Sequence, residues 1–186
     1  MTQRRIYQND FPYFITTNIR DGLPLFNDRH CAQLLSNIMF CSCRMKRYLL
    51  YAYTIMPDHV HLIIGQNPNR AQVSVPAIGV SRVGATAPTE RCGGGGGENI
   101  STVMYTIKSM FYTEMRKRHN ICYSFWHKRF YSRLITSMDY LENAIEYIRH
   151  NPIKENLPKK FRQRPYQYFN EDKVNALFFS LNLGKI

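Results

Sequence analysis

Two histidines separated by one residue are the first side chains in this sequence that could carry chemistry. His59-Val60-His61 follows Pro57-Asp58, a turn-forming pair, and leads into an aliphatic run. Because side chains alternate along a strand, His59 and His61 are expected to project from one face, roughly 6.6 Å apart at Cα. Two imidazoles placed in this way can hold one metal ion. The alternative is a pair of half-exposed polar side chains on a sheet face.

A tyrosine and an asparagine further along the chain could complete such a site. Tyr147 and Asn151 are four residues apart in a segment with helical periodicity, so both lie on one face of the predicted helix. This face is offset from the apolar stripe of the same helix. A phenol and an amide oxygen can therefore reach the same point in space. For Tyr147 the alternative is a tyrosine that only packs at the flank of the helix.

The segments that must position these side chains alternate between strand-like and helix-like patterns. Aromatic and β-branched runs predict strands, and apolar residues at three- and four-residue intervals predict helices. Proline is expected to end the last helix. In chain order the predicted elements are a strand at 11–20, a helix at 27–46, two strands that flank Pro57-Asp58, a helix from 100 to 119, a strand at 126–136 and a helix from Asp139 to Pro152.

The domain organisation follows from composition. Residues 66–98 hold seven of the ten glycines and almost no large apolar side chain, which predicts a flexible insertion. The domain itself is predicted to span 1–157, interrupted by that insertion. Residues 158–186 interleave basic and aromatic side chains and are interpreted as a C-terminal tail, which either grips a nucleic-acid backbone or wraps the domain.

The charge of the chain indicates a polyanionic partner. The formal net charge is +12 over 186 residues, and nucleic acid is the commonest partner of such a basic protein. A basic surface without a specific partner, with an ordinary solvated edge strand at 126–136, is the alternative. The predicted DNA-binding side chains are Arg116, Lys117, Arg118, Lys128, Arg129, Arg133, Lys154, Lys159, Lys160 and Arg162.

Membrane association is not expected. The first ten residues contain no apolar segment of the kind found in signal peptides, and no uninterrupted apolar run reaches the length that spans a bilayer. The sequence therefore predicts a cytoplasmic protein.

Three stretches together resemble the single-tyrosine HUH transposases, and within them the REP-associated tyrosine transposases (IS200-like transposases). They are Met56-Pro57-Asp58-His59-Val60-His61-Leu62-Ile63-Ile64, Trp126-His127-Lys128-Arg129-Phe130-Tyr131 and Glu146-Tyr147-Ile148-Arg149-His150-Asn151-Pro152-Ile153-Lys154. The resemblance covers about residues 8 to 157. It implies an α+β fold of the RRM or ferredoxin-like type, in which an antiparallel sheet carries the histidines on a central strand. It also implies divalent-metal-dependent cleavage of single-stranded DNA, often beside a hairpin.

Carried over residue by residue, the resemblance makes His59 and His61 the metal-binding pair and Tyr147 the nucleophile. Asn151 takes the place of the third ligand, where some relatives have glutamine. Attack by Tyr147 would leave a 5′-phosphotyrosine and a free 3′-hydroxyl, and the covalent link would keep the phosphodiester's energy for strand transfer. Two imidazoles and an amide oxygen suit Mg²⁺ or Mn²⁺ supplied with the substrate better than a tight structural zinc.

Two other functions are compatible with the same residues. One is an RRM-like nucleic-acid-binding protein without catalytic turnover. The other is a zinc-dependent hydrolase that uses His59 and His61 with a water nucleophile and is indifferent to Tyr147. The sequence also leaves open whether the protein acts as a monomer or as a homodimer that shares its tyrosine helix.

Overall fold

The computed structural model describes residues 11–67, 99–121 and 123–183. Three short 3-10 turns, Arg20–Gly22, Leu25–Asn27 and Lys159–Arg162, lie between the longer elements. In chain order those elements are β1 (Tyr13–Asn18), α1 (Arg29–Met45), β2 (Tyr48–Ile55), β3 (His59–Gln66), α2 (Ile100–His119), β4 (Tyr131–Leu134), α3 (Met138–Lys154), β5 (Gln167–Phe169) and α4 (Glu171–Leu183).

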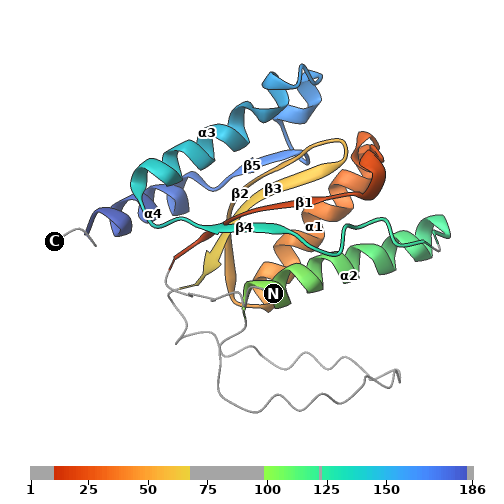
Figure 1. The fold of residues 1–186 in the computed structure, drawn as a ribbon, viewed down its shortest axis with the longest axis horizontal. Helices are drawn as coiled ribbons and strands as arrows, with labels where there is room; N and C mark the ends of the chain where they lie inside the picture. Colours follow the sequence, from red (N-terminus) through yellow and green to blue (C-terminus); the bar gives the residue numbers. More distant parts are fainter. Residues whose placement is uncertain (1–10, 68–98, 122, 184–186) are drawn as a thin grey trace, which may run out of the picture.

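The strands form one antiparallel sheet in the order β4-β1-β3-β2-β5 (Figure 1). The first four strands with α1 and α2 follow the β-α-β-β-α-β order of a ferredoxin-like fold. The α+β class and the antiparallel sheet predicted from the sequence are therefore confirmed. β5 is an addition at the free edge of β2.

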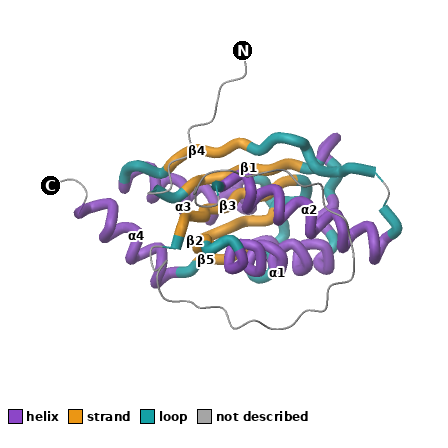
Figure 2. Tube along the Cα trace, turned by 90° about the horizontal axis from the view of Figure 1, so that it is seen from below, coloured by secondary structure: helices purple, strands orange, loops and turns teal. Residues whose placement is uncertain are grey.

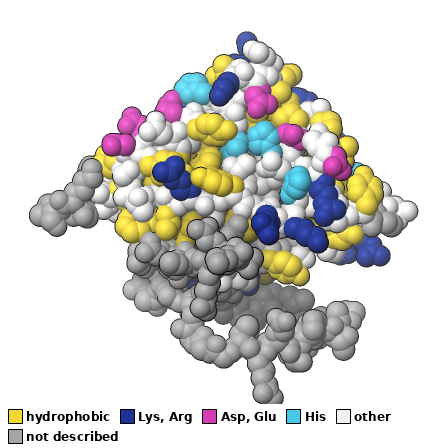
Figure 3. Space-filling model, viewed as in Figure 1, with side chains coloured by type: hydrophobic (Ala, Val, Ile, Leu, Met, Phe, Trp, Pro, Cys, Tyr) yellow, Lys and Arg dark blue, Asp and Glu magenta, His cyan; other side chains and the backbone are white. Residues whose placement is uncertain are grey.

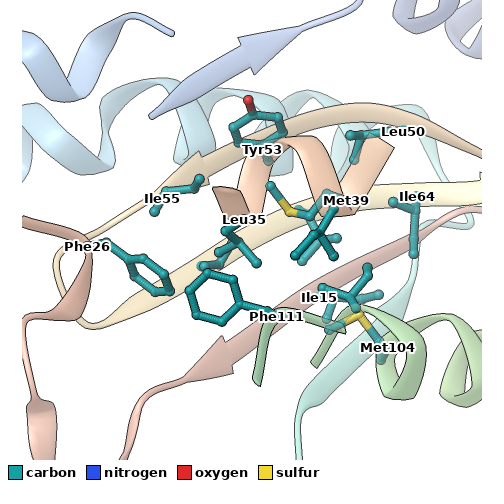
Figure 4. Packing of buried hydrophobic residues seen from close by; sticks show 14 of the residues in the cluster. Ile15, Phe26, Leu35, Met39, Leu50, Tyr53, Ile55, Ile64, Met104 and Phe111 are labelled. Carbon is teal, nitrogen blue, oxygen red and sulfur yellow. The ribbon is translucent and has the colours of Figure 1, made fainter. Parts of the chain in front are cut away.

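Each face of the sheet is covered by its own pair of helices. On one face, α1 and α2 lie side by side (Figure 2) and bury the larger core. Figure 4 shows side chains such as Ile15, Leu35 and Phe111 pointing into that core from a strand and from the two helices. On the other face, α3 and α4 pack on a smaller core that includes Phe14 and Ile63. The second face is therefore less completely covered, and it carries the candidate site.

Each of the first two long helices begins with a side-chain cap. The Asp28 side chain accepts a hydrogen bond from the His30 backbone N–H at the start of α1. The Asn99 side chain accepts a hydrogen bond from the Thr102 backbone N–H at the start of α2. These side chains satisfy N–H groups that have no partner within the helix.

α3 differs from its prediction at both ends. Ser137, not Asp139, caps its first turn, and the helix continues through Pro152 to Lys154. Proline normally ends a helix because it has no N–H for the carbonyl four residues earlier. That carbonyl belongs to Ile148, and here it accepts a hydrogen bond from the Gln167 side chain at 2.9 Å. A substitute donor from outside the helix allows Pro152 to lie inside it.

The predicted strand at 126–136 is shorter in the structure. Only Tyr131–Leu134 pairs with β1, while Trp126 makes an isolated bridge with Ile19. The segment from His127 to Phe130 is instead attached to α2 through Lys108, whose Nζ donates to the His127 carbonyl at 2.8 Å. Its aromatic residues therefore pack against a helix instead of pairing along an edge.

Residues 159–169 pack on the domain. β5 pairs with β2, and Phe161 and Tyr166 are buried in the larger core. Most of the predicted insertion at 66–98 lies outside the described residues, since β3 extends to Gln66 and the described chain resumes at Asn99. Within the described ranges, no helix is long and apolar enough to cross a membrane.

Candidate active site

His59 and His61 lie at the start of β3, directly after the turn at Pro57-Asp58. Their ring centroids are 4.7 Å apart, so both rings lie on one face of the strand. β3 is the middle strand of the sheet, and its neighbours on β1 are Asn18 opposite His59 and Thr16 opposite His61. Figure 3 shows histidine side chains near the middle of the exposed face, with lysine and arginine side chains gathered below and to the right of them.

Each histidine is held through its Nδ1 atom. The Thr16 hydroxyl lies 2.8 Å from His61 Nδ1, and an Asp58 carboxylate oxygen lies 2.6 Å from His59 Nδ1. These contacts leave Nε2 of each ring for a further partner. The Nε2 atom of His61 is buried and has no hydrogen-bond partner among the described residues. Hydrogen bonds of this kind fix the tautomer and orientation of histidines that bind metals.

His61 is neutral over the physiological pH range. Burial, with a smaller contribution from neighbouring His59, lowers the pKa of His61 from 6.5 to about 3. The cause is the cost of placing a charged imidazolium where water cannot solvate it. A neutral imidazole keeps the lone pair that a metal ligand needs.

Tyr147 lies next to the histidines, on α3. Its ring centroid is 4.9 Å from that of His61 in an edge-on arrangement, and 5.9 Å from that of Phe14. Phe14 in turn stacks on His61 with a centroid distance of 5.7 Å. Tyr147 nevertheless remains 44% exposed. One chain therefore brings the histidine pair and an accessible tyrosine together, and the tyrosine comes from the chain's own α3.

Asn151 is buried one turn further along α3, and its Nδ2 atom has no hydrogen-bond partner among the described residues. Because the nitrogen and oxygen of a side-chain amide are assigned from their surroundings, the amide oxygen can equally occupy that position. No group of three His, Cys, Asp or Glu side chains suited to a metal occurs in the described part of the chain. The donors that fit a metal here are thus two imidazoles, with a buried amide on the neighbouring helix.

All ten predicted DNA-binding side chains are exposed. Within the described ranges they form three groups. Arg116, Lys117 and Arg118 lie at the end of α2, and Lys128, Arg129 and Arg133 lie before and on β4. Lys154 ends α3, and Lys159, Lys160 and Arg162 lie in the turn that follows it. Lys117 and Arg118 each form an ion pair with Glu114. Arg133 is the group member that projects toward the tyrosine helix, because its guanidinium lies 4.5 Å from the Tyr140 ring.

Sequence reasoning missed the residues that support the site. Asp58 was interpreted only as a turn residue, although its position next to His59 in the sequence was a usable signal. Thr16 and Phe14 come from a strand more than 40 residues earlier, and Gln167 comes from the predicted tail. Nothing local in the sequence connects these three to the histidines, since only strand pairing and helix packing bring them there.

The fold and the site together define a class: a ferredoxin-like sheet that presents two histidines to a tyrosine on a neighbouring helix. Compared with solved structures, the chain is similar to a REP-associated tyrosine transposase bound to a REP hairpin, with a TM-score of 0.61, 20% identity, and coverage of 95% of this chain and 87% of that chain. At this identity the similarity establishes the fold.

A second similar structure is a Deinococcus radiodurans protein assigned as a transposase, with a TM-score of 0.46, 16% identity, and coverage of 84% of this chain and 98% of that one. This alignment is too weak to support an argument. No protein-family model and no curated protein sequence matches the chain.

Proposed function

We propose that this protein nicks single-stranded DNA and transfers the cut strand through a covalent 5′-phosphotyrosine, with Tyr147 as the nucleophile. The observation that carries the proposal is the position of the Tyr147 ring, 4.9 Å from His61, whose own ring is 4.7 Å from His59. Tyr147 is accessible, while His61 is buried and neutral. A tyrosine that served only for packing would not need to be exposed beside such a pair.

Each step of the proposed reaction forms one phosphate ester bond and breaks another. The Tyr147 Oη attacks the scissile phosphorus and loses its proton, a P–O bond to the tyrosine forms, and the bond to the 3′-oxygen breaks. The departing 3′-oxygen takes up a proton to give a free 3′-hydroxyl. Attack of a 3′-hydroxyl on the phosphotyrosine then reverses these changes on another strand. No nucleotide cofactor is required because the number of phosphodiester bonds does not change.

His59 and His61 would hold a divalent metal, Mg²⁺ or Mn²⁺, through their Nε2 atoms, and Asn151 is the candidate third ligand. Such an ion would polarise the scissile phosphate and stabilise the charge that develops on it. Thr16 and Asp58 orient the two rings through Nδ1. The edge-on contact of Tyr147 with His61 holds the phenol beside the pair, while the side chain stays partly exposed.

Hairpin-forming DNA is the proposed substrate. The similar transposase structure contains a REP hairpin, and this chain presents a net charge of +12 with ten exposed basic side chains in three groups. Positive charge of this kind supplies affinity for the phosphate backbone regardless of sequence. The site face of the sheet can then receive the unpaired strand beside the hairpin.

The test is incubation of the purified protein with labelled single-stranded hairpin DNA from the flanks of its own gene, with Mn²⁺, followed by denaturing electrophoresis. A covalent protein-DNA adduct is expected that requires metal and is absent in Tyr147→Phe. Phenylalanine preserves the ring contacts with His61 and Phe14 and removes only the hydroxyl. Tyr105→Phe is the matched control, because Tyr105 is a 73% exposed tyrosine on α2.

Cleavage without an adduct, surviving in Tyr147→Phe, would replace the tyrosine mechanism with a metal-activated water. Retention of the adduct in Tyr147→Phe would show that another residue is the nucleophile.

A further inference from the structure

The face of the sheet that carries His61 continues outward onto β4. Thr16 pairs with His61 on one side and with Tyr131 on the other, and Phe14 pairs with Arg133. Directly paired residues project from the same face of a sheet, so Tyr131 and Arg133 are on the site face. Neighbouring strands are about 4.8 Å apart, which places Tyr131 roughly 10 Å from His61 at Cα.

Arg133 contacts the first turn of α3. The Arg133 guanidinium lies 4.5 Å from the centre of the Tyr140 ring. Burial raises the pKa of Tyr140. The positive charge of Arg133 lowers this pKa and Tyr131 raises it, so both side chains are close enough to Tyr140 to interact with it electrostatically. Tyr140 and Tyr147 are seven residues apart, on one face of α3 and roughly 10 Å apart along its axis. We call Tyr131, Arg133 and Tyr140 the β4 cluster.

The β4 cluster has the chemistry that a nucleotide requires. Tyr131 is 56% exposed although it is on the site face, so its ring is available for stacking. In the described ranges no carboxylate pairs with Arg133, and stacking on Tyr140 holds its guanidinium while leaving N–H groups at the edge. Flat guanidinium groups of this kind bind phosphate oxygens. Proteins that bind single strands combine aromatic platforms with such positive charges.

We propose that the β4 cluster is a subsite for a nucleotide that flanks the scissile phosphate, with its base stacked on Tyr131 and its phosphate bound by Arg133. The inference rests on the proposed single-stranded DNA function and adds where the strand lies. From the histidine pair the strand passes over Thr16 to the free edge of the sheet at β4. The subsite accepts any base, because every base has a face that stacks.

Equilibrium binding tests the subsite separately from cleavage. In a Tyr147→Phe background, which cannot form the proposed adduct, fluorescence anisotropy measures the affinity for labelled dT12 and for an abasic 12-mer with the same phosphates. Tyr131→Ala is expected to weaken dT12 binding by about five- to 100-fold and to leave abasic binding unchanged. Tyr131→Phe should bind like the parent, since it keeps the ring. Tyr105→Ala is the control for loss of an exposed tyrosine.

Arg133 is tested through the salt dependence of the same binding. Arg133→Gln should weaken dT12 and the abasic 12-mer alike and reduce the slope of log affinity against log salt by about 0.7, the value for one phosphate contact on a single strand. Arg133→Lys should keep that slope while weakening binding, because a lysine supplies the charge without the planar fork.

Three results would overturn the subsite. One is an unchanged ratio of dT12 to abasic affinity in Tyr131→Ala. Another is equal loss in Tyr131→Ala and Tyr105→Ala. A third is failure of the parent to bind either 12-mer, which would also remove the single-stranded DNA function. A different outcome separates the two proposals: Tyr131→Ala loses the preference for dT12 over the abasic 12-mer, while the wild type forms no adduct in the cleavage assay. That combination would support the subsite and reject only the nicking chemistry.

Discussion

The side-chain amide of Gln167 on β5 donates a hydrogen bond of 2.9 Å to the carbonyl of Ile148 on α3. This is the carbonyl that Pro152 leaves unpaired, because proline has no N–H. The same amide also donates to the Arg149 carbonyl at 3.2 Å. Ile148 directly follows Tyr147, so a residue near the end of the chain fixes the helix that carries the proposed nucleophile against the sheet that carries the histidines.

Gln167→Leu should therefore affect both stability and chemistry. The substitution leaves the Ile148 carbonyl without its donor, and a buried unpaired group costs about 1 to 3 kcal/mol. A shift of α3 of about 1 Å is expected to slow adduct formation by about 100-fold. Urea unfolding and single-turnover adduct formation measure the two effects.

Pro152→Ala provides the partner for a double-mutant cycle. Alanine restores an N–H at position 152 that can serve the Ile148 carbonyl, so Pro152→Ala should rescue part of the stability lost in Gln167→Leu. Additive losses in the double variant would mean that Gln167 does not act by donating to the Ile148 carbonyl.

Sequence patterns predict geometry within one helix or strand, whereas contacts between distant parts of the chain leave no local pattern. The His59 and His61 pair and the Tyr147 to Asn151 spacing are local patterns, and each predicts its geometry within one element. Gln167 and Thr16 reach the site only through tertiary packing, so no local pattern indicates them. The helix through Pro152 was mispredicted for the same reason, since the compensating donor is 15 residues further along the chain.

Thr16 and Thr17 form a natural matched pair for testing how His61 is oriented. The Thr16 hydroxyl bonds His61 Nδ1 at 2.8 Å, whereas the neighbouring Thr17 hydroxyl is buried without a hydrogen-bond partner among the described residues. Thr16→Val should weaken Mn²⁺ binding by about 10- to 100-fold, the usual effect of losing a hydrogen bond to a ligating histidine. Thr17→Val should leave metal affinity unchanged. Equal Mn²⁺ affinities for the two variants, measured by calorimetric titration, would show that Thr16 does not orient the ring.

The depressed pKa of His61 predicts acid sensitivity of the metal-free protein. Burial lowers this pKa to about 3, while an unfolded histidine titrates near 6.5, so the unfolded state binds the proton more readily between these values. Stability contributed by the neutral ring is thus complete above about pH 6.5 and decreases as the pH falls toward 3. At pH 5 the loss is about 2 kcal/mol. Urea unfolding in EDTA at several pH values should show this slope, and His61→Gln should flatten it; an identical slope in that variant would contradict the assignment.

Lys108 is expected to hold the basic segment that precedes β4 in its binding position. Its Nζ donates to the His127 carbonyl at 2.8 Å and to the Arg129 carbonyl at 3.2 Å, and burial lowers its pKa to about 8. Lys108→Met keeps an apolar stem but removes both hydrogen bonds, so dT12 affinity should fall by about three- to tenfold. Lys173→Met, which removes an exposed positive charge on α4, is the matched control and should cost less.

The pH dependence of dT12 binding tests whether Lys108 acts through its charged ammonium group. Between pH 7 and 9 the wild-type Lys108 loses its proton, whereas an exposed lysine with an ordinary pKa near 10.4 keeps it. Wild-type affinity should therefore decrease over this range, and the affinity of Lys108→Met should stay nearly constant. If the two variants and the wild type all weaken in parallel, the pH dependence comes from another group, and the charge of Lys108 does not control DNA binding.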